Sequence, residues 1–64
     1  MNANEIREIL ESIEINSDGE HIEDCTYAVR TGENEWSICD NGEEVAGCDL
    51  ETAVSIVLEN LTIS

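Results

Sequence analysis

The chain has 64 residues, of which 41% are hydrophobic, and its 16 acidic residues stand against two arginines and no lysine, which gives a formal net charge of −14. This size allows one domain, residues 1–64, and leaves little room for an enclosed active site. So acidic a surface repels nucleic acid and anionic membranes and attracts basic proteins. No apolar run approaches the roughly 18 residues of a membrane span, and the acidic N-terminal segment is unlike a signal peptide, so we expect a cytoplasmic protein.

A first helix is predicted over residues 3–14. Asn2 is a good N-cap, and Glu5 stands three residues later, as in a capping box. Apolar residues then recur at the spacing of one helix face, at Ile6, Ile9, Leu10 and Ile13. On the solvent face, Arg7 is placed to pair with Glu11 one turn later. The segment is therefore an amphipathic helix with an acidic outer face.

The first of three predicted strands covers residues 22–30. Turn-forming residues occupy 16–20, and Cys25, Tyr27 and Val29 then alternate with Thr26, Ala28 and Arg30, as in a strand. The residues that follow, Thr31-Gly32-Glu33-Asn34, are typical of a hairpin loop.

The second strand contains Trp36 and Ile38 in the same alternating phase. Because the two share a face, we expect the Trp36 ring to lie in the core. Asn41-Gly42 is the strongest short signal for a hairpin turn, and it leads into a short third strand over 43–48.

A second helix is predicted to begin after Asp49, a good N-cap, and to end near Asn60. Its broad apolar face is formed by Leu50, Val54, Val57, Leu58 and Leu61. The predicted fold is α+β, with a helix, a three-stranded antiparallel meander and a helix, both helices lying on one face of the sheet. The other face is left to solvent or to a partner, and the two sheet edges leave both a monomer and a dimer open.

The sequence does not favour a metal or catalytic site. Glu14, Asn16 and Asp18 resemble the start of a calcium-binding loop, but Cys25 stands where that loop needs a glutamate. The side chains that could bind zinc are His21, Cys25, Cys39 and Cys48. Their spacing matches no common zinc motif, and the single histidine lacks a matching nucleophile. We therefore expect no metal, no cofactor and no enzymatic activity, and reduced, mostly buried thiols.

The segment from Glu33 to Glu44, ENEWSICDNGEE, holds five carboxylates and no basic residue. Spread over a domain about 28 Å across, the net charge amounts to one per about 2 Å, against about 1.7 Å of axis for duplex DNA. A protein that occupies a nucleic-acid groove explains this density. A soluble acidic domain without that role and halophilic adaptation are the alternatives. We expect the counter-charges to lie on another protein.

The opening MNANEIREI, the hairpin ENEWSI and the turn followed by a helix resemble the small type II-A anti-CRISPR proteins of phages, which block an RNA-guided nuclease by imitating DNA. The resemblance follows the element order over residues 1–60 and, in identity, the first nine residues and the hairpin after Arg30. It implies an acidic hairpin and neighbouring loops inserted into the basic site for the protospacer-adjacent motif, with Asn34 and Glu35 as the positions carried over. Members of the family have a further helix with more acidic contact residues, and residues up to Ser64 contain no counterpart of it. The resemblance therefore implies imitation of DNA and does not identify the target.

The sequence thus predicts a small acidic DNA mimic that blocks the basic nucleic-acid-binding site of a host defence nuclease or DNA-processing enzyme. It would bind neither nucleic acid nor membrane directly and, if phage-encoded, would act in the host cytoplasm. Small phage inhibitors of uracil-DNA glycosylase, restriction enzymes or RNA polymerase act in the same way, by occupying a basic site on their target. The residues expected to bind the partner are Glu33, Asn34, Glu35, Asp40, Glu43 and Glu44. The alternative is a non-inhibitory acidic interaction module, such as an antitoxin or assembly subunit, whose partner need not bind DNA.

Overall fold

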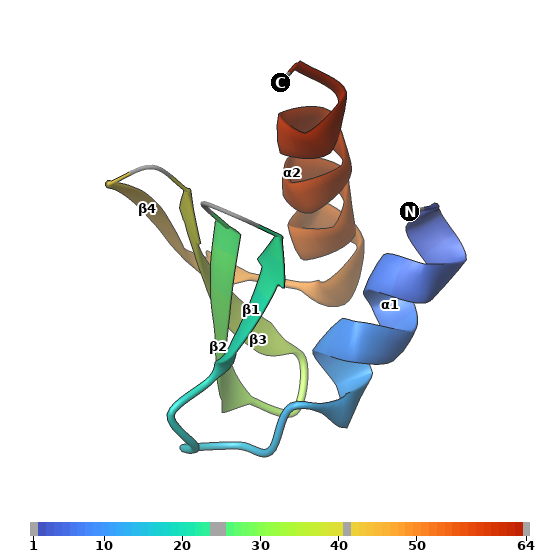
Figure 1. The fold of residues 1–64 in the computed structure, drawn as a ribbon. Helices are drawn as coiled ribbons and strands as arrows, with labels where there is room; N and C mark the ends of the chain where they lie inside the picture. The colour runs from blue at the N-terminus through green and yellow to red at the C-terminus, as the bar shows by residue number, and fades with distance from the viewer. Residues whose placement is uncertain (1, 24–25, 41, 64) are drawn as a thin grey trace.

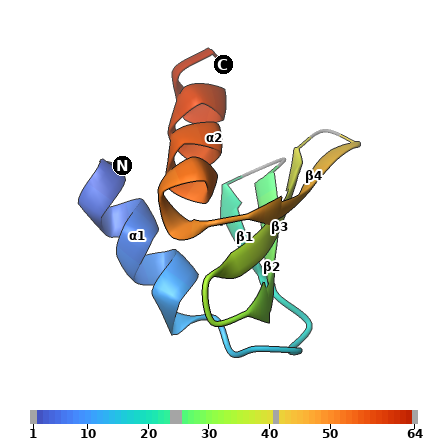
Figure 2. The same cartoon turned by 180° about the vertical axis from the view of Figure 1, so that it is seen from behind.

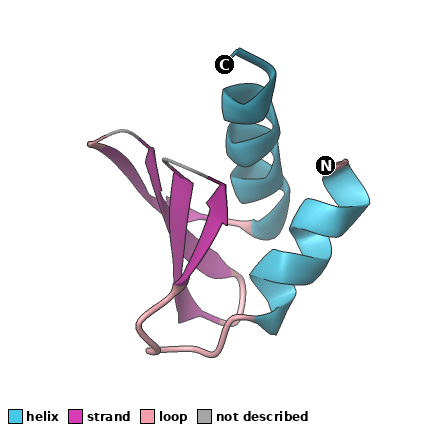
Figure 3. Cartoon of the chain, viewed as in Figure 1, coloured by secondary structure: helices cyan, strands magenta, loops and turns pink. Residues whose placement is uncertain are grey.

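The computed structural model describes residues 2–23, 26–40 and 42–63 (Figure 1). Within these residues the fold is α+β, with a four-stranded antiparallel sheet in the order β1-β2-β3-β4. Both helices lie on one face of the sheet, so helices and strands form two layers (Figures 2 and 3). The elements in chain order are α1 (Ala3–Ser12), β1 (Glu20–Glu23), β2 (Thr26–Gly32), β3 (Glu35–Asp40), β4 (Glu43–Cys48) and α2 (Leu50–Ile63).

The prediction of three strands is wrong, because the segment 22–30 forms parts of two strands. β1 ends at Glu23 and β2 begins at Thr26, and these two residues are partners in an antiparallel pair. No glycine, proline or asparagine marks the reversal, and the residue alternation continues across it, so the pattern favoured one long strand. The two residues between β1 and β2 lie outside those described.

The β3–β4 connection has the expected position. β3 ends at Asp40 and β4 begins at Glu43, which leaves two residues between them. Asn41 lies outside the described residues, and Gly42 has φ 91°, the left-handed value that a tight hairpin turn requires. The sheet therefore contains both predicted hairpins, β2–β3 and β3–β4, and one further hairpin, β1–β2, that the sequence pattern did not show.

α1 begins as predicted. Asn2 Oδ1 accepts a hydrogen bond from the Glu5 backbone N–H at 2.9 Å, and Glu5 Oε1 accepts one from the Asn2 backbone N–H at 3.1 Å. The capping box is therefore complete. The helix ends at Ser12, two residues before the predicted end, because Ile13 has an extended backbone with φ −71° and ψ 131°.

α2 is capped by two side chains. Asp49 Oδ1 accepts from the Thr52 backbone N–H at 2.8 Å, and Asn34 Oδ1 accepts from the Leu50 backbone N–H at 3.0 Å. Hydrogen bonds from the side chain and then the backbone of Thr52 hold the pKa of Asp49 below its ordinary range. Asp49 is thus the predicted N-cap, and the helix continues to Ile63, beyond the predicted end.

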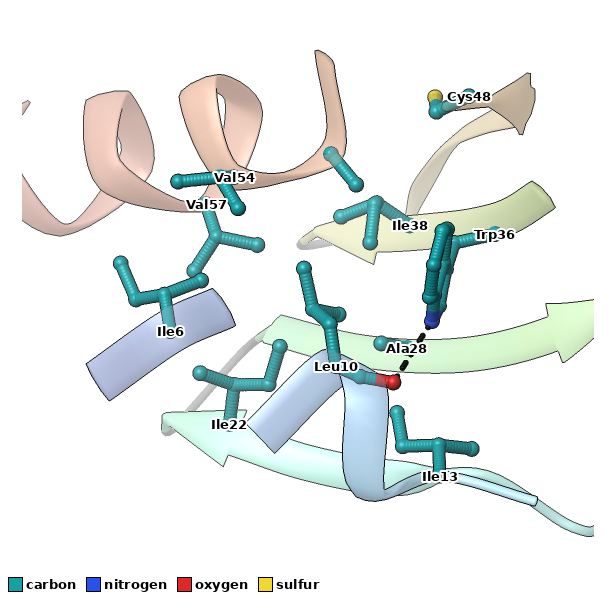
Figure 4. Packing of buried hydrophobic residues seen from close by; sticks show 11 residues of the cluster. Ile6, Leu10, Ile13, Ile22, Ala28, Trp36, Ile38, Cys48, Val54 and Val57 are labelled. Atoms are coloured by element: carbon teal, nitrogen blue, oxygen red, sulfur yellow. Dashed lines mark hydrogen bonds between the residues drawn. The ribbon is translucent and has the colours of Figure 1, made fainter. Parts of the chain in front are cut away.

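The hydrophobic core lies between the sheet and the two helices (Figure 4). Its buried hydrophobic side chains are Ile6, Leu10, Ile13, Ile22, Ala28, Trp36, Ile38, Cys48, Ala53, Val54 and Val57. Every described helix and strand contributes to this set. Trp36 is 1% exposed, which confirms the prediction that its ring is in the core. Each large side chain buried in this way stabilises the fold by about 1.5–3 kcal/mol.

The C-terminal end of α1 is bound by two side chains from the sheet. Trp36 Nε1 donates to the Leu10 carbonyl at 2.9 Å (Figure 4), and Arg30 Nη1 donates to the carbonyls of Glu11 and Ile13 at 3.1 and 3.2 Å. The last carbonyls of a helix lack intrahelical partners and carry partial negative charge, so a cation is favourable there. The last turn of α1 contains no basic residue. Arg30 of β2 supplies that charge from the sheet.

Arg30 also organises the loop between β2 and β3. Its Nε donates to the Gly32 carbonyl at 3.1 Å, and its Nη2 donates to the Glu33 carbonyl at 2.7 Å. The guanidinium carbon lies 4.9 Å from the centroid of the Trp36 ring, a cation–π distance. One guanidinium therefore joins the end of α1, the β2–β3 loop and the core tryptophan.

Gly19 allows the loop before β1 to pack tightly against β2. Its φ of 87° is in the left-handed region. A Cβ at this position would overlap the Ala28 carbonyl oxygen and stand 2.9 Å from Val29 Cγ2. The Tyr27 hydroxyl donates to the Asp18 carbonyl, which holds the same loop against the strand. Both the backbone conformation and the space therefore require glycine.

We predict that Gly19→Ala lowers the free energy of unfolding by about 2–4 kcal/mol, because left-handed strain and overlap with β2 add together. The matched control is Gly42→Ala, where φ is 91° but nothing lies within 4 Å of the added Cβ. That change should cost about 1–2 kcal/mol, from backbone strain alone. Urea unfolding of both variants measures the difference, and equal losses would contradict the tight packing of the loop.

We also predict that Arg30→Lys destabilises the fold by about 2 kcal/mol or more, because an ammonium cannot reproduce the planar set of donors that binds four carbonyls. Arg7→Lys makes the same change at a partly exposed arginine and should cost less than about 0.5 kcal/mol. Unfolding of the two variants followed by far-UV circular dichroism tests this. Similar losses would mean that the contacts of Arg30 contribute no more than a surface ion pair.

Candidate functional site

The six candidate partner-binding residues lie at opposite ends of the sheet. Three occupy the β2–β3 loop and the start of β3: Glu33, Asn34 and Glu35. The other three lie at the β3–β4 hairpin: Asp40, Glu43 and Glu44. β3 has six residues, and a strand advances about 3.3 Å per residue, so its two ends are about 17 Å apart. We call these groups the loop cluster and the hairpin cluster, and the structure does not bring them together (Figure 1).

In the loop cluster, Glu33 and Glu35 are exposed. Asn34 is also exposed, but its amide oxygen is engaged as a cap of α2, so this residue positions the loop. A Cβ added at Gly32 would lie 3.3 Å from Glu35 Oε1, and one added at Gly47 would lie 3.7 Å from Glu35 Oε2. The Glu35 carboxylate therefore lies between the ends of β2 and β4, where two glycines leave room for it.

In the hairpin cluster, like charges face each other across the strands. Asp40 of β3 and Glu43 of β4 are directly paired, and an opposed pair of carboxylates is destabilising. Asp40 is half-buried and accepts a hydrogen bond from the Thr26 hydroxyl at 3.1 Å, whereas Glu43 and Glu44 are exposed. A cation placed beside Asp40 and Glu43 would relieve their repulsion. The cluster is therefore suited to a lysine or arginine side chain.

The two arginines contribute little to balancing these clusters. Arg7 pairs with Glu51 of α2 at 3.2 Å, and not with Glu11, the partner predicted on its own helix. It is the only ion pair among residues 2–23, 26–40 and 42–63. Arg30 is held by backbone carbonyls, as described above. The carboxylates of the clusters therefore depend on solvent ions or on a partner for their counter-charges.

The sequence analysis left the sheet face opposite the helices to solvent or to a partner, without naming its residues. We call it the open face, and its central side chains are His21, Tyr27, Val29, Ser37 and Cys39. Paired positions place His21, Tyr27, Cys39 and Glu44 in one row across the four strands. His21 and Tyr27 make an edge-to-face ring contact with centroids 4.8 Å apart. The alternation of Tyr27 and Val29 with Thr26 and Ala28 predicted a strand but did not distinguish its two faces, and the structure buries Thr26 and Ala28.

The cysteines are in different environments. Cys48 is 4% exposed in the core, and burial, followed by the nearby negative charge of Asp49, raises the pKa of its thiol. Cys39 is half-buried on the open face, so the expectation of a core thiol does not hold for it. Cys25 lies outside the described residues. In the part of the chain that the structure describes, no three histidine, cysteine or acidic side chains gather as a metal site would require.

No protein-family model matches the chain, and no match was found among curated proteins or among solved structures. None of the described helices is long and apolar enough to cross a membrane.

We predict that Cys39 is alkylated at least about tenfold faster than Cys48 in the native protein. Cys39 is more accessible, and the raised pKa of Cys48 lowers its thiolate fraction near neutral pH. A brief pulse of iodoacetamide followed by peptide mass spectrometry reads both thiols in the unmodified sequence. Repeating the pulse in urea is the control, since unfolding should make the two rates similar. Equal native rates would show that Cys48 is not held in the core.

Proposed function

We propose that this protein is a small acidic inhibitor that binds the basic nucleic-acid-binding site of a host defence nuclease or DNA-processing enzyme and thereby blocks DNA binding. The observation that carries the proposal is the set of exposed carboxylates without basic partners. Apart from the half-buried Asp40, every acidic side chain whose exposure is described is exposed. The protein would act by occupancy, without catalysis of its own, in the cytoplasm of a phage-infected host.

The charge density supports imitation of DNA. The net charge of −14 is carried by a body that extends 29 Å along its longest axis. This is one charge per about 2 Å, against about 1.7 Å of axis for a DNA duplex. A groove lined with lysine and arginine side chains attracts both surfaces by the same long-range field, which raises the rate of association.

The placement of the clusters suggests how such a groove would be contacted. The loop cluster and the hairpin cluster are separated by the length of β3, about 17 Å. A basic groove of that length can bind both at once, whereas a small cationic pocket can bind only one. Carboxylates that pair with desolvated arginine or lysine contribute most to affinity, and those at the rim mainly affect the association rate. We therefore assign the main contacts to Glu35 and Glu43, one from each cluster.

The second candidate function is a non-inhibitory acidic interaction module, such as an antitoxin or an assembly subunit. The observation that favours it is the open face, whose centre contains no carboxylate and includes Tyr27 and Val29. Stable interfaces commonly have such a centre with a charged rim. Under this alternative the partner need not bind DNA.

The deciding experiment is competition with DNA. Immobilised protein retains its partner from a bacterial lysate, and a short DNA duplex should then displace that partner. Affinity should fall by about tenfold or more between low and physiological ionic strength, because the interface is electrostatic. A partner that binds DNA and this protein together, with affinity insensitive to salt, would support the interaction module instead.

Charge reversal locates the contact. The double variant Glu35→Lys with Glu43→Lys should abolish binding, because it places positive charge in both clusters. The matched control, Glu8→Lys with Glu11→Lys, makes the same change in net charge on the exposed face of α1 and should weaken binding by less than about tenfold. Circular dichroism establishes that both variants are folded. Equal effects would show that only net charge matters.

A further inference from the structure

β4 is an edge strand that projects from the body of the protein. Its paired neighbour is β3, so the backbone groups on its other side point out of the sheet. Its first five residues, Glu43 to Gly47, are all exposed, although successive side chains point to opposite faces. Figures 1 and 2 show the β3–β4 hairpin extending away from the helices. The edge is therefore accessible from both faces and along its backbone.

An exposed hydrophobic side chain lies on this edge. Val45 is 46% exposed, and it is paired with Ile38, which is buried beneath the helices. Val45 therefore lies on the helix-facing side of the sheet, beyond the area that the helices cover. A strand added beside β4 would cover Val45 and extend the core outward.

The other edge of the sheet is less suited to strand addition. β1 has four residues, and its pairing with β2 becomes irregular after His21. In β4 the pairing with β3 is regular from Glu43 to Val45 and shifts only before Cys48. Both edge strands contain a register shift, so the difference between them is length, and short edge strands are a common device that prevents strand addition. β4 is therefore the edge that can accept another strand.

We propose that the β4 edge binds an extended, basic segment of a protein partner as a fifth strand of the sheet. Added strands obtain affinity from main-chain hydrogen bonds and specificity from alternate side chains. Here Glu44 faces the open side, while Glu43 and Val45 face the helix side. The matching segment places an apolar residue beside Val45 and, two positions away on the same face, a lysine or arginine beside Glu43, with a further basic residue beside Glu44 on the open side. The inference rests on the proposed function only for the basic character of the partner.

Electrostatic repulsion disfavours a second copy of this chain as the strand that binds the β4 edge. Each copy has a net charge of −14, and joining two β4 edges would bring two hairpin clusters into one sheet. Like charges opposed in a sheet are destabilising. A cationic strand instead places positive charge beside Asp40 and Glu43, the opposed pair within the hairpin. The same edge therefore repels itself and attracts a basic segment.

The test uses the whole protein and a synthetic peptide of about six residues, the usual strand length, in which lysines flank a central valine on both sides. The peptide is blocked at both ends. On saturation with the peptide, backbone amides of β4 should exchange with solvent at least about fivefold more slowly, while those of β1 should be unchanged. Methylating alternate amide nitrogens of the peptide, on the edge that faces β4, should weaken binding by about tenfold or more, because charge is kept and hydrogen bonds are lost.

Matched variants test the part played by Val45. Val45→Thr should weaken peptide binding by about threefold or more, whereas Ile15→Thr, at a residue with a similar 42% exposure in the loop before β1, should leave it unchanged. Both substitutions leave the net charge unaltered.

Three results would overturn the proposal. The first is no binding of the peptide, and the second is equal affinity for the methylated peptide. The third is protection of the β4 amides in the protein alone that grows as the protein concentration is raised. The last would assign the edge to a second copy of the chain. The peptide experiment contains no DNA, so it can succeed even if DNA fails to displace the partner. If the peptide does not bind, the proposed inhibition can still occur through other surfaces of the protein.

Discussion

The binding of the end of α1 by Arg30 and Trp36 is the interaction on which the rest of the structure depends. A helix of ten residues is marginal in water by itself, so α1 must be held by the sheet. Its apolar face packs in the core, and its last carbonyls are satisfied from β2 and β3. Because Arg30 is one of only two cations in the chain, this use removes it from the balancing of carboxylates. The fold therefore uses one of its two arginines for stability and leaves the carboxylates of the two clusters without that side chain as a neighbour.

The sheet tolerates this charge because of where the acidic residues lie. Among the described residues, neither the buried set nor the centre of the open face contains a carboxylate. Acidic side chains occupy strand ends, the solvent face of α1 and the projecting hairpin, where water screens them. Self-repulsion is thereby kept away from the core. It is concentrated at the positions where a basic partner would gain most from contact.

Much of the fold could be predicted because local signals were strong. The caps at Asn2 and Asp49 act on adjacent backbone, and the phase of Trp36 is fixed by simple alternation. The β1–β2 hairpin was missed because its turn has no glycine or proline, and only the return of β1 onto β2 distinguishes two strands from one. Five of the six candidate residues could be chosen by charge, and their separation follows from the strand predicted between the two hairpin turns. The role of Asn34 as a cap of α2 could not be predicted, because it joins residues that are distant in the sequence.

Trp36 gives the molecule a built-in optical reporter. It is the only tryptophan in the sequence, and its indole N–H is bonded to the last turn of α1. Its emission wavelength therefore senses whether that helix remains seated on the sheet, because departure of the helix would expose the ring to water. The projecting part of β4 lies away from this contact. A ligand bound to β4 would leave the emission wavelength of Trp36 unaltered. A ligand that separates α1 from the sheet would shift the emission to longer wavelength.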